Sequence, residues 1–572
     1  MKFWEIYKAR CLILKFNILV GGTAGQGMDT ISDFLEKLLF KKGFYVFSNK
    51  DYMSRVRGGH NFTQVRFGDE PIYTHTTSID LMIALDKDTI DAHLNNLKDN
   101  GIIIADEKIE YDDKRVKTFP LMKLAKAAGL TRAFGSVAAG IVIKHFGISN
   151  EGVSEIFNNK FTDEIRDINV DAFNKGYDLV DSTYDLKKGV LKDNILINGN
   201  TSIALGALAG GLSYYAAYPM TPATSIMTYL SKKQVEAGIV VDQVEDEIAA
   251  INAAIGASYA GARSMTGSSG GGFSLMVEAL GLAGIMETPL VVVDSQRPGP
   301  ATGLPTRTEQ SDLSFLLTAS HGEFPRMVIA VRNPEDAFYQ TFRALNLADK
   351  YQTVVLLLTD QYLADYNITV PKFDVQSLKI ERHIAGEEVL TVGEEYQRYK
   401  LTENGISPRF IPGKVKGQIV LVDSDEHTED SHITEEADVR NEQMQKRMKK
   451  LDLIKEDLIE PEYFGVENPD TLLLGWGSTY GALKEAVDML NKDGVSVGAL
   501  SFGDISPLPQ NLLAKYSKDA KTLINVEQNF TGQLGKFITQ ETGLIMDKSI
   551  LKYDGRQLNS IEIYDSVKKE VL

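Results

Sequence analysis

Glu247 is the first candidate for acid–base chemistry, because its neighbours indicate an unusual setting. It follows two other acidic residues, Glu245 and Asp246, and precedes the almost wholly apolar stretch IAAINAAIGASYAGA. A helix that is apolar all round is buried, so Glu247 is expected at the entry to a core. A carboxyl group in that position can share a proton with a bound base. The alternative is an acid favoured by the dipole at a helix N-terminus, which suits Glu245 and Asp246 better.

Thr221 and Arg307 belong to motifs suited to binding a carboxylate. Thr221 lies between two prolines in YPMTPAT, after a strand-like run and before a helical one. Ligands of α/β sheets bind at the carboxyl ends of strands, where a hydroxyl group can hydrogen-bond a substrate. Arg307 lies in the long Pro/Gly-rich loop 297–313, and arginine suits bidentate carboxylate binding. A structural turn and a surface arginine are the alternatives for these two residues.

A glycine-rich turn near the N-terminus indicates an anion site. The turn GGTAGQG contains Gly25 and Gly27 and opens a helical stretch, so its N–H groups can hold a phosphate. Its spacing is G-x-x-G-x-G rather than the dinucleotide pattern G-x-G-x-x-G. Downstream, Arg55 and Arg57 lie beside a Gly-Gly pair in a cationic loop suited to phosphates or carboxylates. A tight strand–helix turn and a solvated basic loop are the alternatives.

The elements that must position these groups alternate between strands and helices. A strand is expected over 13–20, and the residues after GGTAGQG repeat apolar positions at the spacing of an amphipathic helix. The runs PLVVVDSQ and TVVLLLTD are typical of strands in a second region, and TLLLGWGS is typical of a strand in a third. The sequence therefore predicts a multidomain α/β fold of mostly parallel sheets covered by helices.

The length of 572 residues predicts about four domains. We place them at 12–190, 195–370, 371–465 and 466–572. The third is an acidic, less regular connector. It contains EHTEDSHITEEADVR, whose two histidines and acids are compatible with a metal site, although solvated charge is the preferred interpretation.

Composition excludes several classes of protein. Apolar residues make up 43% and charged residues 24%, which is ordinary for a globular chain. The net charge of −17 disfavours nucleic acid as a partner. The single cysteine, Cys11, excludes an internal disulfide, a four-cysteine zinc site and an iron–sulfur cluster held by this chain. No apolar run has the length of a membrane helix. The basic start and CLILKFNILV suggest a signal peptide, but Lys15 and Asn17 interrupt the run, so a first strand and a cytoplasmic location are expected.

In chain order, these motifs resemble those of 2-oxoacid:ferredoxin oxidoreductases. The resemblance is closest to subunits with fused γ and α parts, as in 2-oxoglutarate synthase α subunits, and extends from about Phe16 to the end. It implies a γ-type α/β domain, a thiamine-diphosphate pyrimidine-binding-type domain and, after the connector, a transketolase C-terminal-like domain. The motifs that carry it are GGTAGQG with SRVRGGHN, YPMTPAT, EDEIAAINAAIGASYAGARS and GGGFSLMVEALGLAGIMETPLVVVDSQRPGPATGLPTRTEQSDL.

The resemblance implies roles for the candidate residues. Glu247 would bond the aminopyrimidine of thiamine diphosphate, with Glu245 as the fallback because the acidic cluster allows a two-residue slip. Thr221 and Arg307 would hold the substrate carboxylate. The γ region would help to bind coenzyme A, through Gly25, Gly27, Arg55 and Arg57.

The resemblance also implies a partner. This sequence has no G-D-G…N motif for Mg²⁺–diphosphate and no cysteines for a cluster. In the family these groups lie on a separate β subunit, which carries the Mg²⁺ and a [4Fe-4S] cluster. We therefore expect a site at a subunit interface, an inactive isolated chain, ferredoxin as electron acceptor, and a heterodimer or dimer of heterodimers.

The implied reaction is coenzyme A-dependent oxidative decarboxylation of a 2-oxoacid to acyl-CoA and CO2. We favour 2-oxoglutarate as substrate, with pyruvate and branched-chain 2-oxoacids as alternatives. A non-catalytic scaffold paralogue is a second alternative. An NAD-dependent dehydrogenase is a third, which the glycine spacing disfavours.

Overall fold

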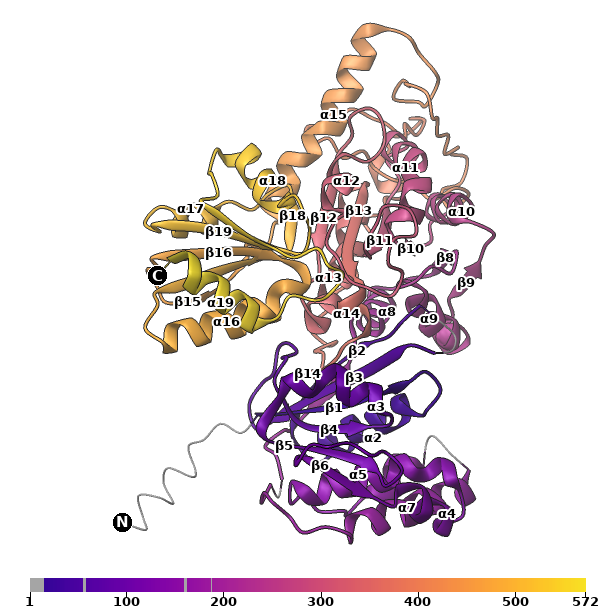
Figure 1. The fold of residues 1–572 in the computed structure, drawn as a ribbon. Helices are drawn as coiled ribbons and strands as arrows, with labels where there is room; N and C mark the ends of the chain where they lie inside the picture. Colours follow the sequence, from indigo (N-terminus) through magenta and orange to yellow (C-terminus); the bar gives the residue numbers. More distant parts are fainter. Residues whose placement is uncertain (1–14, 55–57, 159–161, 187, 572) are drawn as a thin grey trace. The chain divides into compact units, whose positions relative to one another are not determined.

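The computed structural model describes residues 15–54, 58–158, 162–186 and 188–571 (Figure 1). They form two compact units. The first ends at Ile197 and includes Asp365–Lys372, and the second comprises Asn198–Ala364 and the chain from Phe373 onward. Each unit combines helices with sheets that contain parallel strands, as the alternating pattern predicts.

The first unit contains an eight-stranded sheet in the order β6-β5-β4-β1-β3-β2-β14-β7. Strands β1, β4, β5 and β6 are parallel, so their carboxyl ends lie at one edge. The strands are β1 (Lys15–Thr23), β2 (Tyr45–Asp51), β3 (His60–Gly68), β4 (Ile79–Ala84), β5 (Leu97–Asp106), β6 (Val116–Phe119), β7 (Asn194–Ile197) and β14 (Asn367–Pro371).

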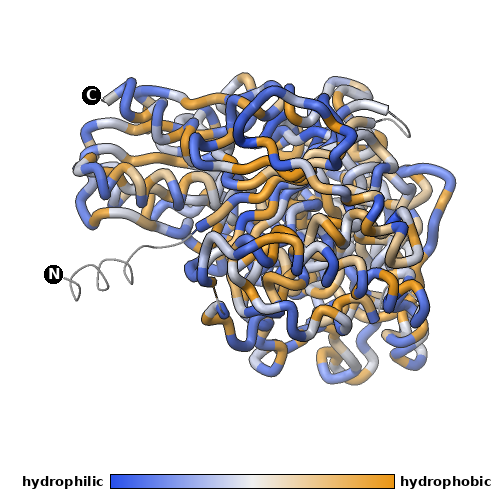
Figure 2. The backbone as a smooth tube through the Cα atoms, turned by 60° about the horizontal axis from the view of Figure 1, so that its bottom comes forward, coloured by the Kyte–Doolittle hydropathy of each residue, from blue (hydrophilic) through white to orange (hydrophobic). Residues whose placement is uncertain are grey.

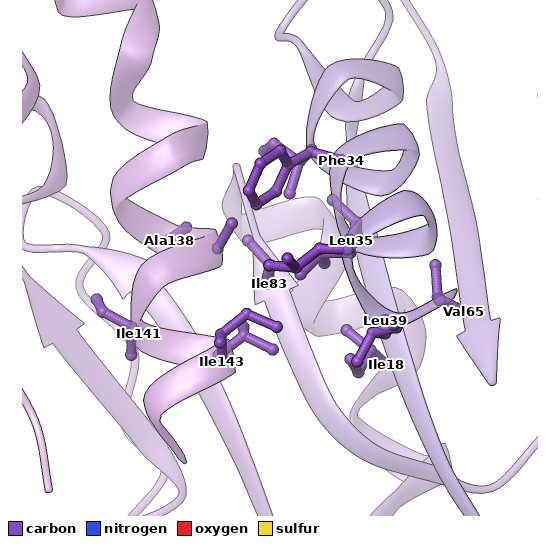
Figure 3. Close-up of a cluster of buried hydrophobic side chains, with 14 of the residues drawn as sticks. Ile18, Phe34, Leu35, Leu39, Val65, Ile83, Ala138, Ile141 and Ile143 are labelled. Atoms are coloured by element: carbon purple, nitrogen blue, oxygen red, sulfur yellow. The ribbon is translucent and has the colours of Figure 1, made fainter. Parts of the chain in front are cut away.

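Apolar faces of two helices cover this sheet (Figure 3). Phe34, Leu35 and Leu39 of α2 meet Ile83 of β4, and Ile141 belongs to α5. The helical spacing after GGTAGQG therefore forms the core predicted for it. The helices are α2 (Met28–Lys41), α3 (Lys87–His93), α4 (Leu121–Ala128), α5 (Phe134–His145), α6 (Val153–Phe157) and α7 (Asp163–Tyr177).

The first unit also takes in a strand from much later in the chain. β14 pairs antiparallel with both β2 and β7. The boundaries drawn from the sequence at 195 and 370 assigned β7 and β14 to the middle region, so these boundaries are corrected. The physical reason is that β14 pairs with strands that lie more than 150 residues earlier in the chain. No local sequence pattern encodes such pairing.

The second unit contains a seven-stranded sheet in the order β18-β12-β13-β11-β10-β8-β9. Its strands are β8 (Tyr214–Ala217), β9 (Val240–Gln243), β10 (Ser264–Ser268), β11 (Leu290–Gln296), β12 (Arg326–Ala330), β13 (Val354–Asp360) and β18 (Asp504–Ser506). Its helices are α8 (Gly199–Ala209), α9 (Thr224–Ala237), α10 (Glu247–Tyr259), α11 (Gly270–Ile285), α12 (Leu313–Thr318), α13 (Pro334–Tyr351) and α14 (Gln361–Asp365).

A five-stranded sheet in the order β15-β17-β16-β19-β20 completes the second unit. Its strands are β15 (Glu462–Gly465), β16 (Thr471–Trp476), β17 (Val497–Phe502), β19 (Thr522–Glu527) and β20 (Lys548–Leu551). The helices of this part are α16 (Tyr480–Lys492), α17 (Asn511–Ser517), α18 (Gln533–Thr542) and α19 (Ser560–Val571). Apolar and hydrophilic stretches alternate along the chain, as expected of elements that bury one face (Figure 2).

The acidic connector is more regular than its sequence indicates. It contains the 20-residue helix α15 (Ala437–Glu456). The buried face of α15 includes Lys446 and Lys450, which both form salt bridges with the fully buried Glu287. Because the docking face is cationic rather than apolar, the hydrophobic pattern of an amphipathic helix is missing and the helix escaped prediction.

Among the residues that the structure describes, no helix has both the length and the apolar character needed to cross a membrane.

Candidate active site

Glu247 is the first residue of α10, and its surroundings differ from those of the two acidic residues that precede it. Asp246 caps the helix, because its carboxylate accepts a hydrogen bond of 2.7 Å from the Ala249 N–H. Glu245 is exposed, whereas Glu247 is only 3% exposed. The geometry therefore favours Glu247 over Glu245 as the carboxyl group that enters the core.

The Glu247 carboxyl group faces the start of α11. Ser268, the last residue of β10, donates its Oγ–H to Glu247 Oε1 over 3.3 Å. Among the described residues, this is the hydrogen bond recorded for the carboxyl group. A Cβ on Gly272 would lie 2.4 Å from Glu247 Oε1, so only glycine leaves room for the carboxyl group at the first turn of α11.

Thr221 is exposed, in the turn between β8 and α9. Two side chains hold this turn. Asn200 Nδ2 donates to the Pro222 carbonyl over 2.8 Å, and Arg297 Nη1 donates to the Thr221 carbonyl over 3.0 Å. Met220, the preceding residue, accepts a hydrogen bond at Sδ from Ser269 Oγ, which follows Ser268 directly. The turn of Thr221 is thus connected to the surroundings of Glu247.

Arg297 is a functional candidate that the sequence analysis missed. It follows β11 immediately, at the carboxyl end of a strand, and is half-buried. Burial lowers the pKa of Arg297, and Asp312 partly restores it. The missed signal was its place as the first residue of the 297–313 loop, directly after the strand PLVVVDSQ, where α/β sheets bind ligands.

Arg307 lies further along the same loop and is also half-buried. Loops around the five-stranded sheet hold its neighbours: the Thr308 N–H donates to the Gly555 carbonyl, and the Gln310 N–H donates to the Gln528 carbonyl over 2.7 Å. A Cβ on Gly555 would lie 3.2 Å from Arg307 Cβ. These contacts hold the backbone at Arg307 in place. The side chain that contacts the Thr221 turn, however, is that of Arg297.

These residues gather at one edge of the seven-stranded sheet. Strands β8, β10 and β11 are parallel neighbours, and Thr221, Ser268 and Arg297 stand at or just beyond their carboxyl ends. This edge is where an open α/β sheet places its ligands. The arrangement offers a buried carboxyl group as proton acceptor, with a hydroxyl and a guanidinium group to hold a carboxylate.

The glycine-rich turn lines a separate cavity in the first unit, of about 660 Å³. Gly25 and Gly27 both have positive φ angles, of 92° and 90°, which glycine adopts without strain. The cavity lies at the carboxyl ends of parallel strands, because Asp106 ends β5 and Leu121 begins the helix after β6. Its walls are mainly apolar, and Arg132 is the cation among the residues that line it.

Arg132 was missed because the segment around it carries no motif. Arg55 and Arg57, predicted beside the glycine-rich turn, lie outside the described residues, as does Cys11. The described part of that loop ends at His60, whose Nε2 lies 2.8 Å from Nε2 of His93. Burial lowers the pKa of both histidines, that of His93 to about 4, so this pair is neutral at physiological pH.

Within the described ranges, no group of three or more His, Cys, Asp or Glu side chains is placed to hold a metal ion. His427 of the acidic connector is fully buried and stacks on Tyr399 with ring centroids 3.7 Å apart. His432 is exposed beside Asp430. One of the two histidines is therefore a core residue and the other is solvated.

Three family models match consecutive parts of the chain. Residues 17–179 match pyruvate ferredoxin/flavodoxin oxidoreductase. Residues 205–446 match the thiamine diphosphate-binding domain of pyruvate flavodoxin/ferredoxin oxidoreductase, and 469–561 match core domain II of pyruvate:ferredoxin oxidoreductase. These matches define the class of protein as an oxidoreductase with a thiamine diphosphate-binding domain.

Curated relatives and a solved structure narrow this class. The chain is 32% identical to the 2-oxoacid:ferredoxin oxidoreductase subunit alpha of Sulfolobus sp., over 98% of this chain and 97% of the relative. It is 29% identical to the 2-oxoglutarate oxidoreductase subunit KorA of Mycobacterium tuberculosis, over 93% and 89%. The chain therefore belongs to the alpha subunits of the 2-oxoacid:ferredoxin oxidoreductase family, as its motifs predict.

The same fold occurs in 2-oxoglutarate:ferredoxin oxidoreductase from Magnetococcus marinus, solved with 2-oxoglutarate, coenzyme A and succinyl-CoA bound. The TM-score is 0.91 at 32% identity, and the match covers 98% of this chain and 100% of that one.

Proposed function

We propose that this chain is the γα subunit of a heteromeric oxidoreductase that converts a 2-oxoacid, coenzyme A and oxidised ferredoxin to acyl-CoA, CO2 and reduced ferredoxin. The observation that carries this proposal is the buried Glu247 at the carboxyl edge of the seven-stranded sheet, connected through Ser268 and Met220 to the clamped turn of Thr221.

The surroundings of Glu247 fit thiamine diphosphate. Glu247 receives a single recorded hydrogen bond from the described residues, on Oε1, which leaves Oε2 available to a ligand. Gly272 leaves space beside the carboxyl group that a Cβ would fill. Thiamine diphosphate, when bound, supplies the carbanion chemistry that decarboxylation needs. The role of Glu247 is to accept a hydrogen bond from the aminopyrimidine and to stabilise the proton that it carries.

The substrate clamp consists of Thr221 and Arg297, with Arg307 further along the same loop. Thr221 is exposed beside Arg297 Nη1, so its hydroxyl group and the remaining guanidinium N–H groups can meet one carboxylate. The contact between Arg297 and the Thr221 carbonyl fixes the guanidinium orientation before the substrate arrives. We assign the head-group contact to Arg297 and keep Arg307 as the second candidate cation.

We assign coenzyme A to the cavity at Gly25 and Gly27. The N-terminus of α2 leaves N–H groups for a phosphate, and Arg132 adds a positive charge at the wall. The volume of about 660 Å³ and the apolar lining suit part of a cofactor-sized molecule. A structural neighbour is solved with coenzyme A bound, which supports coenzyme A as a ligand of this chain.

The site requires a partner subunit. This chain has one cysteine, and no described group of side chains is placed to hold a metal. The Mg²⁺–diphosphate site and the [4Fe-4S] cluster are therefore assigned to a β subunit, which completes the site in a heterodimer or a dimer of heterodimers. Ferredoxin is the proposed electron acceptor, in line with the alpha-subunit relatives.

We favour 2-oxoglutarate as substrate, because the Mycobacterium relative and the Magnetococcus structure are both named for it. The test is a panel of 2-oxoglutarate, pyruvate and a branched-chain 2-oxoacid on the chain co-purified with its β subunit, with coenzyme A-dependent viologen reduction as readout. The highest kcat/KM is expected with 2-oxoglutarate. A preference for pyruvate or the branched-chain acid would overturn the substrate assignment, and absence of turnover with all three would overturn the function.

A further inference from the structure

Arg398 and Arg409 of the acidic connector are buried cations that the proposed function does not use. Arg398 is 4% exposed and Arg409 is 6% exposed. Nη1 of Arg398 and Nε of Arg409 are both buried and have no hydrogen-bond partner among the described residues. A buried donor that carries charge is costly when it has no acceptor, so each of these N–H groups calls for one.

Other N–H groups of the two arginines are already engaged. Nη2 of Arg398 donates to the Glu287 carbonyl over 2.7 Å, and Nη2 of Arg409 donates to Asp349 Oδ1 over 2.6 Å. Glu287 follows α11, and Asp349 lies in α13. These contacts hold the guanidinium groups in place, so the unpaired N–H groups cannot turn to another part of the chain without breaking them.

Both arginines line the same small cavity, of about 10 Å³. That volume has room for one particle of the size of a water molecule. Ser258 and Tyr259, at the end of α10, also line it, but their hydroxyl groups donate to backbone carbonyls. Among the described residues that line the cavity, no side chain is a carboxylate. The cavity wall therefore offers charged donors without a charged acceptor.

The surroundings of this cavity contain more buried positive than negative charge. Partly exposed Arg382 and Glu381 contribute one charge of each sign. Guanidinium groups stay protonated, and Lys446 remains mostly charged at neutral pH because burial lowers its pKa only to about 8. An excess of buried charge is costly unless an ion of opposite sign balances it. The buried cations are Arg263, Arg398, Arg409, Lys446 and Lys450, and the buried carboxylates paired with them are Asp349 and Glu287.

We propose that the cavity binds one monatomic anion, such as chloride, which accepts hydrogen bonds from Arg398 Nη1 and Arg409 Nε and holds the connector against the end of α10. The volume is too small for phosphate or a carboxylic acid. The site is separate from Glu247, because Glu247 begins α10 and the cavity lies at the other end of that helix. The inference does not rest on the proposed function, since its tests need no turnover.

The solution test measures the melting temperature of the full chain while chloride replaces gluconate at constant ionic strength. An anion that binds the folded chain alone stabilises it, so the melting temperature should rise by about 2 °C and then level off. Arg398→Gln and Arg409→Gln should each remove this rise. A melting temperature that does not respond to chloride, or an undiminished rise in both variants, would overturn the proposal.

A matched control separates the anion from a general loss of stability. Arg343 is also a cation of the second unit, but its guanidinium group donates to Asp504 and to the Asp457 carbonyl. Arg343→Gln should therefore lower the melting temperature and keep its rise with chloride. If Arg343→Gln removed the rise as well, the response to chloride would not belong to this cavity and the proposal would fail.

A crystallographic readout needs no variant. Crystals of the unmodified full chain grown with bromide in place of chloride should give an anomalous peak in the cavity, between Arg398 Nη1 and Arg409 Nε. A water molecule at that position, with bromide confined to the surface of the chain, would refute the anion site.

Discussion

The seven-stranded and the eight-stranded sheets offer ligands in contrasting ways at the carboxyl ends of their parallel strands. In the seven-stranded sheet, the edge presents a buried carboxyl group, a clamped turn and two arginines on one loop. In the eight-stranded sheet, the edge opens into a cavity of about 660 Å³ with mainly apolar walls and one lining arginine. Both follow the same rule for ligand placement in α/β sheets.

This contrast indicates which ligands each sheet edge can bind in the isolated chain. A cavity with apolar walls and N–H donors can bind part of a large ligand by itself. In the proposed function, the polar side chains at the edge of the seven-stranded sheet act together with a partner subunit that carries the Mg²⁺–diphosphate site. We therefore expect the isolated chain to bind a coenzyme A fragment but not to turn over a 2-oxoacid.

The largest effect is expected at Glu247. Glu247→Gln keeps the shape of the side chain but removes the carboxylate that stabilises a proton on the cofactor, so kcat should fall by a factor of about 10² to 10⁴. Viologen reduction by the complex measures this loss. Glu245→Gln is the matched control, because Glu245 is exposed two residues away, and should retain near-normal activity. A larger loss in Glu245→Gln would transfer the role to that residue.

The next effect distinguishes the two arginines of the loop. Arg297→Ala removes a charged hydrogen bond to the substrate carboxylate and the clamp on Thr221, so kcat/KM for the 2-oxoacid should fall about 10- to 100-fold. Arg307→Ala should lower it by a smaller factor. Steady-state kinetics of both variants decides between them, and the reverse order would make Arg307 the head-group ligand that the sequence motif predicts.

A smaller effect is expected in the cavity of the first unit. Arg132→Gln should raise the KM for coenzyme A about tenfold and leave the KM for the 2-oxoacid unchanged, because the cavity and the clamp lie at different sheets. Calorimetry with adenosine 3′,5′-bisphosphate on the isolated chain should show the same weakening. Arg166→Gln is the control, because Arg166 is paired with Asp163 and Asp167 and does not line the cavity. Equal effects of both variants would refute the assignment.

The smallest effect concerns stability. The pKa of Asp312 is about 6 in the fold against an ordinary value of 3.8, so the folded chain binds more protons than the unfolded chain between about pH 4 and 6. The contribution of Asp312 to the free energy of unfolding should therefore fall as the pH rises through this window, by at most about 3 kcal/mol. Urea unfolding of Asp312→Asn should show a smaller fall than the unmodified chain, because the raised pKa of Asp360 still contributes in the variant. An equal pH dependence in the variant would show that another group causes it.

The sequence predicts some parts of this structure and hides others for physical reasons. The apolar run after Glu247 forces a buried helix, so the setting of that carboxyl group follows from local pattern. Loop 297–313 offers two arginines, and only the fold shows that Arg297 contacts Thr221. The helix α15 was hidden because salt bridges to Glu287 replace an apolar face.

The sequence likewise does not reveal which strands pair when they lie far apart in the chain. Strand β14 joins the first sheet through backbone hydrogen bonds that carry no residue preference, and its apolar residues suit either sheet. Arg132 acquires its position from the helices that surround the cavity, and no neighbouring residue marks it. The family motifs identify the chemistry, whereas the contact between Arg297 and the Thr221 carbonyl became visible only from the structure.

The central claim is that this chain supplies one half of a shared active site. The most direct measurement is viologen reduction with 2-oxoglutarate, coenzyme A and thiamine diphosphate by the chain alone, by its β subunit alone and by the mixture. The account predicts turnover in the mixture alone, and its near-complete loss when the chain carries Glu247→Gln. Turnover by either subunit alone, or full activity of the mixture with Glu247→Gln, would contradict it.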